Sequence, residues 1–325
     1  MKELEPFCLS IREDLLKVEA LMQRELQSNV PFVRHVSEYI ITNGGKRLRP
    51  ILVLLSAKIA GYSGDSAIHC AAALEFMHTA SLLHDDVVDN ADLRRGKSSA
   101  NAIWGNHVSV LVGDFFYCRA CDILVGQKNL SILKKVTDTM VETTEGEVLE
   151  IAKSNSMDIT EEDYLQIITR KTAILISACC QIGAILGNIS EEFALGLGQY
   201  GLYLGISFQL ADDLLDYMSE SEKIGKLKGT DLREGKLTLP LIIALKKATP
   251  EESRIIKDAL IAKELEERRL KEILSIIQKY DGITYTLNLA KQYVLRAKGE
   301  LVQFKPSIEK EALTALANFA IERNR

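Results

Sequence analysis

The chain has 325 residues, 47% of them hydrophobic and 26% charged, which is an ordinary composition for a globular protein with a large core. A formal net charge of −5 disfavours nucleic acid as a partner, and no run of eighteen apolar residues predicts a transmembrane segment. The N-terminal stretch MKELEPFCLSIREDLLK lacks the basic start and unbroken apolar run of a signal peptide, so we expect a cytoplasmic protein.

Apolar residues recur at spacings of three and four through residues 51–239, where no proline interrupts the pattern. This spacing predicts helices, and several of them are apolar on most faces, so other helices must surround them. We therefore predict an all-α fold, one large helical bundle forming a single domain over residues 1–325, with central helices walled by outer ones. In chain order the helices are expected at 51–61, 65–89, 108–125, 136–153, 160–187 and 196–218.

Two local signals mark helix ends. Gly61 follows the first apolar run and is expected to close that helix. Thr160 and Asp163 have the spacing of a capping box, with Asp in place of the usual Glu, and are expected to begin the fifth helix.

Six cysteines are present, and Cys118 with Cys121 forms a CxxC motif. A structural zinc site needs a second pair of ligands at suitable spacing, and the sequence offers none. Because both cysteines fall in an apolar helical pattern, we expect them to be buried free thiols.

An acidic cluster interrupts the second predicted helix in HDDVVDNADLRRG, residues 84–96. Asp85 and Asp89 are four positions apart and share one face of a helix, while Asp86 points about 100 degrees away. Two stacked carboxylates repel each other unless a cation lies between them. Taken alone, the cluster is a weak signal of function, because acid-rich helix ends are common.

A second cluster repeats the same spacing at 211–217, where ADDLLDY carries Asp212, Asp213 and Asp216 after another apolar run. Two copies on two core-type helices are hard to explain as solvated ends. If the two helices face one another, six carboxylates converge on one cavity and provide the hard oxygen ligands that Mg²⁺ prefers. Such metal ions would hold the phosphates of a substrate.

Basic side chains accompany both clusters. The segment GGKRLRP at 44–50 places lysine and arginines after a glycine pair that lets the backbone approach an anion. Each feature also has a purely structural explanation: a surface loop, a basic helix C-terminus, or, for His78, a hydrogen-bonded core histidine. Their combination favours a diphosphate site beside an apolar wall. The candidate polar residues are Lys46, Arg49, His78, Arg94, Arg95, Lys171, Thr172, Gln209, Lys226 and Lys236.

Seven segments occur in the order typical of the trans-prenyltransferases, the polyprenyl diphosphate synthases, and the chain resembles that family over nearly its whole length. They are GGKRLRP, LLHDDVVDNADLRRG, VLVGDFFYCRA, EGEVLEI, KTAILISA, GISFQLADDLLDY and GTDLREGKLTLP. The resemblance implies the all-α isoprenoid synthase fold with a central active-site cavity, usually in a homodimer. It also implies the addition of isopentenyl diphosphate to an allylic diphosphate primer, with about three Mg²⁺ ions in each active site.

The resemblance also implies individual roles. Asp85, Asp89 and Asp212 would be the metal ligands, and Asp86, Asp213 and Asp216 would support them. Thr172 and Gln209 would line the reacting carbon. The allylic diphosphate would be held by Arg94, Lys171, Lys226 and Lys236, and isopentenyl diphosphate by Lys46, Arg49, His78 and Arg95.

Product length is predicted from the helix that precedes Asp85. Ala80 and Ser81 are small, whereas bulky aromatic side chains there close the pocket in short-chain members of the family. One helical turn rises about 5.4 Å, close to one extended isoprene unit, so small residues would admit a long product of about eight units for quinone side chains. Tight helix packing is the alternative explanation for these small residues. Met77, Ala73, Val136 and Met140 are candidates for the wall and floor of the tunnel.

Four other functions compete with this interpretation. A short-chain synthase would share the motifs and stop at a farnesyl or geranylgeranyl product. A non-catalytic subunit of a heteromeric synthase tends to lose aspartates, and a terpene cyclase usually lacks the second cluster and GGKRLRP. A plain helical scaffold would not release pyrophosphate.

Overall fold

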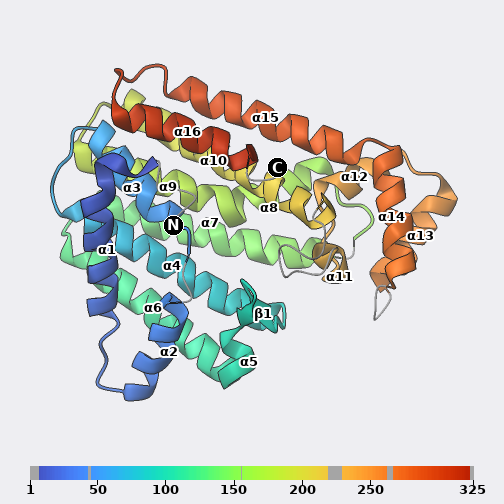
Figure 1. Ribbon diagram of the computed structural model, residues 1–325, viewed down its shortest axis with the longest axis horizontal. Helices are drawn as coiled ribbons and strands as arrows, with labels where there is room; N and C mark the ends of the chain where they lie inside the picture. Colours follow the sequence, from blue (N-terminus) through green and yellow to red (C-terminus); the bar gives the residue numbers. More distant parts are fainter. Residues whose placement is uncertain (1–6, 43–44, 155, 219–228, 262–265, 323–325) are drawn as a thin grey trace. The chain divides into compact units, whose positions relative to one another are not determined.

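The structure, a computed structural model, describes residues 7–42, 45–154, 156–218, 229–261 and 266–322. This part of the chain is almost entirely helical (Figure 1), which confirms the all-α prediction. The strands within it are β1, Leu93–Arg94, and β2, Lys97–Ser98, which pair as a short antiparallel ribbon. The fold is therefore built by packing helices against one another.

The chain forms two compact units, each assembled from three separate segments. Unit 1 comprises Met1–Asp138, Ile176–Gly198 and Glu300–Leu316. Unit 2 comprises Thr139–Leu175, Gln199–Gly299 and Ala317–Arg325. The expectation of one domain over residues 1–325 stays a prediction, and each unit is described below by itself.

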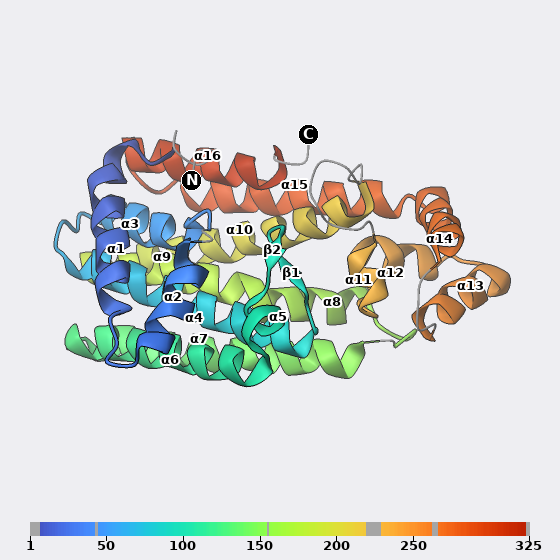
Figure 2. The same ribbon diagram turned by 60° about the horizontal axis from the view of Figure 1, so that its bottom comes forward.

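Unit 1 is organised around α4, Ser66–Val88, which packs against α1, α3 and α6 (Figures 1 and 2). Small residues make this dense packing possible, because Cys70 and the three alanines that follow it are fully buried. The ring of Phe76 meets Phe116 of α6 edge to face, with centroids 5.2 Å apart. The other helices that lie wholly in this unit are η2 (Leu9–Ile11), α1 (Arg12–Glu25), α2 (Pro31–Thr42), α3 (Leu48–Ile59), α5 (Ala100–Trp104) and α6 (Asn106–Gly126).

A close helix contact joins α3 to α9, Ile174–Gly187. A Cβ atom added to Gly183 would lie 2.5 Å from the backbone nitrogen of Ala57 and 2.5 Å from Cβ of Ser56. Only glycine allows the two helices to approach so closely, so this residue fixes their spacing.

Unit 2 has its own apolar core, whose buried members include Ile168, Leu210, Leu239 and Ile277. It takes the later part of α7 (Leu130–Lys153) and most of α10 (Glu191–Met218), together with α8 (Glu161–Ile168). Its other helices are α11 (Thr230–Arg233), α12 (Leu239–Leu245), α13 (Pro250–Ile261), α14 (Glu267–Lys279) and nearly all of α15 (Gly282–Glu300). The last helix, α16 (Ile308–Glu322), is divided between the two units.

The capping box that begins α8 is confirmed. The Thr160 hydroxyl accepts the Asp163 N–H at 3.1 Å, and the Asp163 carboxylate accepts the Thr160 N–H at 2.9 Å. The helix expected over 160–187 is not uniform, however, because the π-helical turn η3, Thr169–Ala173, separates α8 from α9. Such turns are not signalled by the apolar spacing and often mark functional sites.

One expectation about apolar segments needs correction. Cys118 and Cys121 are free thiols as expected, but both are exposed, whereas Phe116 and Ala120 of the same helix are buried. By length and composition, residues Glu161–Gly187 pass a test for a membrane-spanning helix, although no unbroken apolar run is present. The most apolar window of this stretch is 67% buried inside the protein, as in a core helix.

Candidate active site

The first aspartate cluster lies at the C-terminal end of α4. Asp85 and Asp89 are half-buried and share one face, whereas Asp86 is only 2% exposed. The Arg94 guanidinium binds one oxygen of Asp86, with Nε at 2.7 Å and Nη2 at 2.6 Å. Asp86 therefore holds Arg94 in place. The assignment of Asp85 and Asp89 as metal ligands stays a prediction.

The β-ribbon explains how Arg94 returns to α4. Leu93 pairs with Ser98 and Arg94 with Lys97, which leaves Arg95 and Gly96 as a two-residue turn. Both turn residues have positive φ, 55° and 74°, as a type I′ hairpin requires. The hairpin turns the chain sharply after the cluster, so that Arg94 and Arg95 both line a hollow beside α4.

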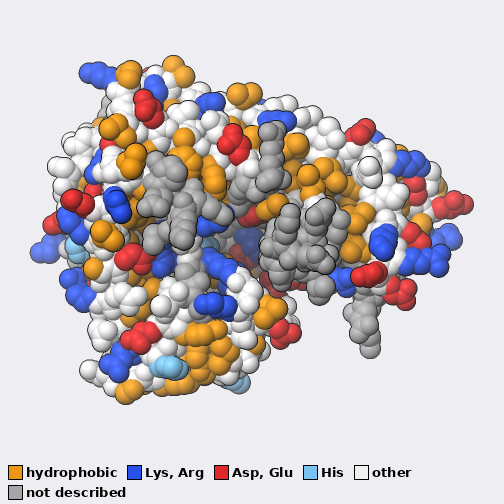
Figure 3. Space-filling model, in the orientation of Figure 1, with side chains coloured by type: hydrophobic (Ala, Val, Ile, Leu, Met, Phe, Trp, Pro, Cys, Tyr) orange, Lys and Arg blue, Asp and Glu red, His pale blue; other side chains and the backbone are white. Residues whose placement is uncertain are grey.

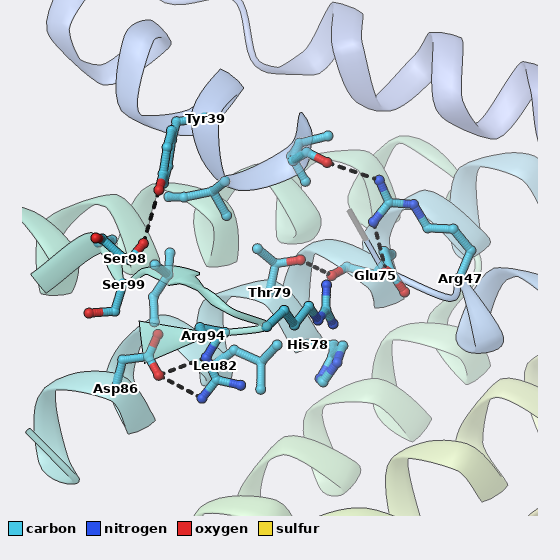
Figure 4. Close-up of a pocket in the computed structure, with 15 residues that line it drawn as sticks. Tyr39, Arg47, Glu75, His78, Thr79, Leu82, Asp86, Arg94, Ser98 and Ser99 are labelled. Carbon is cyan, nitrogen blue, oxygen red and sulfur yellow. Dashed lines mark hydrogen bonds and ion pairs between the residues drawn. The ribbon is translucent and has the colours of Figure 1, made fainter. Parts of the chain in front are cut away.

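This hollow in unit 1 gathers anion-binding side chains. Figure 4 shows Arg94 reaching Asp86 and Arg47 lying beside Glu75, with His78 between these pairs. Arg47 is nearly buried and binds Glu19 at 2.6 Å and Glu75 at 3.1 Å. Arg47 is thus a structural tie between α1, the start of α3 and α4, and it leaves the neighbouring basic residues to bind a ligand.

Arg49 and His78 share a crowded basic environment. Burial lowers the pKa of the Arg49 guanidinium from its usual value, and its Nε is a buried donor without a hydrogen-bond partner. Burial, followed by the nearby arginines Arg49, Arg95, Arg94 and Arg47, holds the pKa of His78 well below its usual value. His78 is therefore neutral near pH 7 and can donate one N–H to an anion. Lys46 is exposed at the rim of this segment.

The π-helical turn of unit 2 carries Lys171 and Thr172. The Lys171 ammonium is bound by two carboxylates of α7, Glu147 at 2.6 Å and Glu150 at 2.7 Å. Gly146 of α7 makes this approach possible, because a Cβ atom there would lie 2.7 Å from the Lys171 backbone nitrogen. The lysine is thus held at the edge of a second hollow, which both Lys171 and Thr172 line.

The second aspartate cluster divides into three different environments. Asp212 is exposed on α10. Asp213 is buried and accepts hydrogen bonds from the Tyr164 hydroxyl at 2.5 Å and the Gln209 amide at 2.8 Å. Burial raises its pKa to about 7. Asp216 accepts the backbone N–H groups of Thr230 and Asp231 at 3.0 and 3.1 Å, so it fixes the start of α11.

Most of the predicted polar site residues therefore lie in a hollow with other predicted residues of the same unit. Lys236 lines the second hollow and lies 2.9 Å from Glu234, whereas Lys226 lies outside the described residues. Among the residues that the structure describes, no group of three or more Asp, Glu, His or Cys is close enough to hold a metal ion. The prediction that both aspartate clusters share one cavity stays a prediction. The residues brought together are His78, Asp86, Arg94 and Arg95 in unit 1, and Lys171, Thr172, Gln209, Asp213 and Lys236 in unit 2.

Three residues that line these hollows were not among the predicted site residues: Glu75, Glu150 and Tyr164. A single acid inside the apolar run AAALEFM was a usable signal for Glu75, since a buried carboxylate needs a cationic partner. Glu150 lies in the segment EGEVLEI but had no assigned partner. Nothing in the local pattern distinguished Tyr164 from an ordinary core tyrosine, because its partner Asp213 is 49 residues away.

The burial of the predicted tunnel residues does not by itself identify a product tunnel. Ala80, Met77, Ala73 and Val136 are buried, while Ser81 and Met140 are half-buried. The Ser81 hydroxyl donates to the His78 carbonyl at 2.9 Å, inside its own helix. These contacts suit both tight packing and a tunnel wall, so the tunnel stays a prediction.

Comparison with known proteins identifies the family. A sequence model described as Polyprenyl synthetase matches residues 30–277. Octaprenyl diphosphate synthase of Escherichia coli is 41% identical over 313 residues, which cover 96% of this chain and 97% of that protein. A decaprenyl diphosphate synthase from Rhodobacter capsulatus superimposes with a TM-score of 0.95 at 36% identity, covering 99% of both chains. A polyprenyl synthase from Caulobacter crescentus, solved with calcium and isoprenyl diphosphate, gives 0.94 at 38% identity over 99% and 98%. The chain therefore belongs to the polyprenyl synthetase family.

Proposed function

We propose that this chain is a long-chain trans-polyprenyl diphosphate synthase, which adds isopentenyl diphosphate to an allylic primer such as farnesyl diphosphate. The observation that carries the proposal is the hollow beside α4, where neutral His78 and three arginines lie next to the first aspartate cluster. This arrangement suits a diphosphate beside a metal site. A product of about eight isoprene units is supported by octaprenyl diphosphate synthases of Escherichia coli and Haemophilus influenzae, 41% and 39% identical.

Magnesium is the proposed cofactor, in about three ions for each active site. The donors fit, because Asp85 and Asp89 present oxygen ligands on one helical face and Asp212 is exposed on α10. When bound, the ions would draw negative charge onto the departing diphosphate and so favour ionisation of the allylic C–O bond. Removal of metal with a chelator should abolish product formation, and added Mg²⁺ should restore it.

The side chains of the protein have separate tasks in this reaction. Arg94, Lys171, Lys226 and Lys236 would bind the allylic diphosphate. Lys46, Arg49, His78 and Arg95 would bind isopentenyl diphosphate, with His78 donating a hydrogen bond without adding charge. Thr172 and Gln209 would turn polar groups toward the allylic cation, and the apolar walls would keep water from it.

A homodimer is proposed from the family resemblance and from exposed apolar side chains in unit 1. Leu111 and Val125 of α6 are 66% and 59% exposed, and Leu130 at the start of α7 is 80% exposed. A second group of apolar side chains gathers near the lower edge of Figure 3. Phe32 of α2 and Ile103 of α5 are also exposed. Apolar groups that are normally buried at interfaces make either face suitable for a partner. A cytoplasmic location and a role in quinone side-chain synthesis complete the proposal.

The test is to incubate the purified chain with labelled isopentenyl diphosphate, farnesyl diphosphate and Mg²⁺, and to size the products after dephosphorylation. A main product near eight isoprene units is expected. Products that stop at fifteen or twenty carbons would instead identify a short-chain synthase, like the short chain isoprenyl diphosphate synthase relative at 36% identity. Activity of the chain alone matters, because a relative from Bacillus subtilis is described as component 2 of heptaprenyl diphosphate synthase.

A further inference from the structure

Tyr164, a buried tyrosine of unit 2, is hydrogen-bonded to the second aspartate cluster. The Tyr164 hydroxyl donates to Oδ2 of Asp213 at 2.5 Å, and its ring belongs to the apolar core of the unit with Ile168 and Leu210. A phenylalanine ring would fill the same core volume. The described hydrogen bond of this hydroxyl, to Asp213, is therefore what a tyrosine adds at this position.

The bond from Tyr164 begins a directional series of hydrogen bonds. With Oδ2 of Asp213 bound to Tyr164, Oδ1 accepts from the Gln209 Nε2 amide group at 2.8 Å. The amide orientation of Gln209 is thereby fixed, since its nitrogen faces Asp213 and its oxygen faces the other way. That oxygen, Oε1, accepts the hydroxyl of Thr172 at 3.0 Å.

The direction of this series decides what Thr172 presents to the hollow. A hydroxyl has one proton and two lone pairs, and the Thr172 proton is committed to Gln209. The lone pairs of its oxygen therefore remain for the hollow that Thr172 lines. If the Gln209 amide were reversed, its NH₂ group would face Thr172, the hydroxyl proton would be released, and a proton would point where the allylic cation forms.

We propose that Tyr164 is a positioning residue of the prenyl transfer reaction. Through Asp213 and Gln209, Tyr164 keeps the lone pairs of the Thr172 oxygen, and not its proton, directed toward the cationic carbon. This inference rests on the proposed function, because it gives Tyr164 a task only if an allylic cation forms beside Thr172. It concerns the rate of the chemical step and leaves the binding of isopentenyl diphosphate unaffected.

The experiment compares Tyr164→Phe with a matched control, Tyr217→Phe. Tyr217 is a buried tyrosine of the same apolar core, and its hydroxyl pairs with the Thr238 hydroxyl at 2.5 Å instead of with Asp213. In steady-state assays with saturating Mg²⁺, Tyr164→Phe should lower kcat about tenfold with the KM for isopentenyl diphosphate within twofold of wild type. The control should keep kcat within about twofold.

A double-mutant cycle tests whether Tyr164 acts through Gln209. In a Gln209→Ala background, Tyr164→Phe should have almost no further effect on kcat, because the series is already broken. Independent, multiplicative losses would overturn the proposal, as would a wild-type kcat in Tyr164→Phe or an equal loss in Tyr217→Phe. If Tyr164→Phe does not fold, Asp213→Asn provides the second variant, since its amide has one oxygen to accept from Tyr164 and Gln209 in place of two. A wild-type kcat there is equally contrary.

The same assays separate this inference from the proposed function. A wild-type protein that forms no prenyl product refutes both. A wild-type protein that forms long products while Tyr164→Phe matches it refutes only the role of Tyr164.

Discussion

Ala80→Phe should shorten the product, and the structure sets the expected size of the effect. Ala80 is fully buried on α4, five residues before Asp85, which is about 7.5 Å along the helix at about 1.5 Å per residue. A benzyl group at this depth leaves room for one or two isoprene units below the aspartates. The main product should therefore be far shorter than eight units, while turnover of a short allylic primer continues.

The Ala80→Phe substitution also overpacks the core, so the control variant must overpack the core without entering the predicted tunnel. Inserting a ring at a fully buried alanine costs about 1–3 kcal/mol of the free energy of unfolding. Ala71 is equally buried, and because it lies nine residues from Ala80 it points to the opposite face of α4. Ala71→Phe should show a similar stability loss with unchanged product length.

Product sizing by reversed-phase chromatography after dephosphorylation, together with thermal melts, measures both effects. An Ala80→Phe enzyme that is active and still makes wild-type products refutes the tunnel along this face. If Ala71→Phe shortens the product equally, the tunnel does not run along the Ala80 face of α4.

Three further predictions concern stability and metal dependence. Gly183→Ala should lower the free energy of unfolding by about 1–3 kcal/mol, because its Cβ would lie 2.5 Å from α3. The control is Gly126→Ala, where a Cβ would meet nothing within 4 Å. In urea titrations the control should leave the free energy of unfolding unchanged or slightly raised. Lys153, then Thr160, lower the pKa of Asp163 to about 2, so the stability from these contacts is present above the unfolded pKa of about 4 and is lost as pH falls toward 2. Melts of Asp163→Asn should lack that part of the acid transition; an unchanged pH profile would contradict the assignment. Asp85→Asn should raise the Mg²⁺ concentration needed for half-maximal activity, and an unaltered requirement would remove Asp85 from the metal ligands.

The pairing of His78 with basic neighbours has a mechanistic consequence. Burial, followed by the neighbouring arginines, holds the pKa of His78 well below its usual value, so the imidazole of the ligand-free site is neutral near pH 7. A diphosphate bound there would accept a hydrogen bond from it. The arginines, not His78, therefore supply the positive charge of the hollow.

Much of the fold follows from local sequence. The spacing of apolar residues predicted α3, α4, α6, α7 and α10, since a helix that buries most of its faces must repeat apolar side chains about every turn. The capping box at Thr160 was equally predictable, because both of its hydrogen bonds lie within four residues. The aspartate pair Asp85 and Asp89 needed only helix geometry to be placed on one face.

Other features depend on residues that are distant in the chain. The π-helical turn at Thr169–Ala173 interrupts a segment whose composition reads as one helix, and Gly146 and Gly205 accommodate it from neighbouring segments. The exposure of Cys118 and Cys121 likewise depends on which face of α6 meets α4, because an all-round apolar helix does not specify its buried side.

The helices, and the chemistry that the acidic and basic residues suit, could be predicted because both follow from spacing along one chain. How the acids are used depends on packing: Asp86 binds Arg94, Asp213 binds Tyr164 and Gln209, and Asp216 fixes the start of α11. Identical side chains at identical spacing acquire different tasks because each meets different neighbours. Burial and hydrogen-bond direction are properties of those neighbours, and packing alone brings them together.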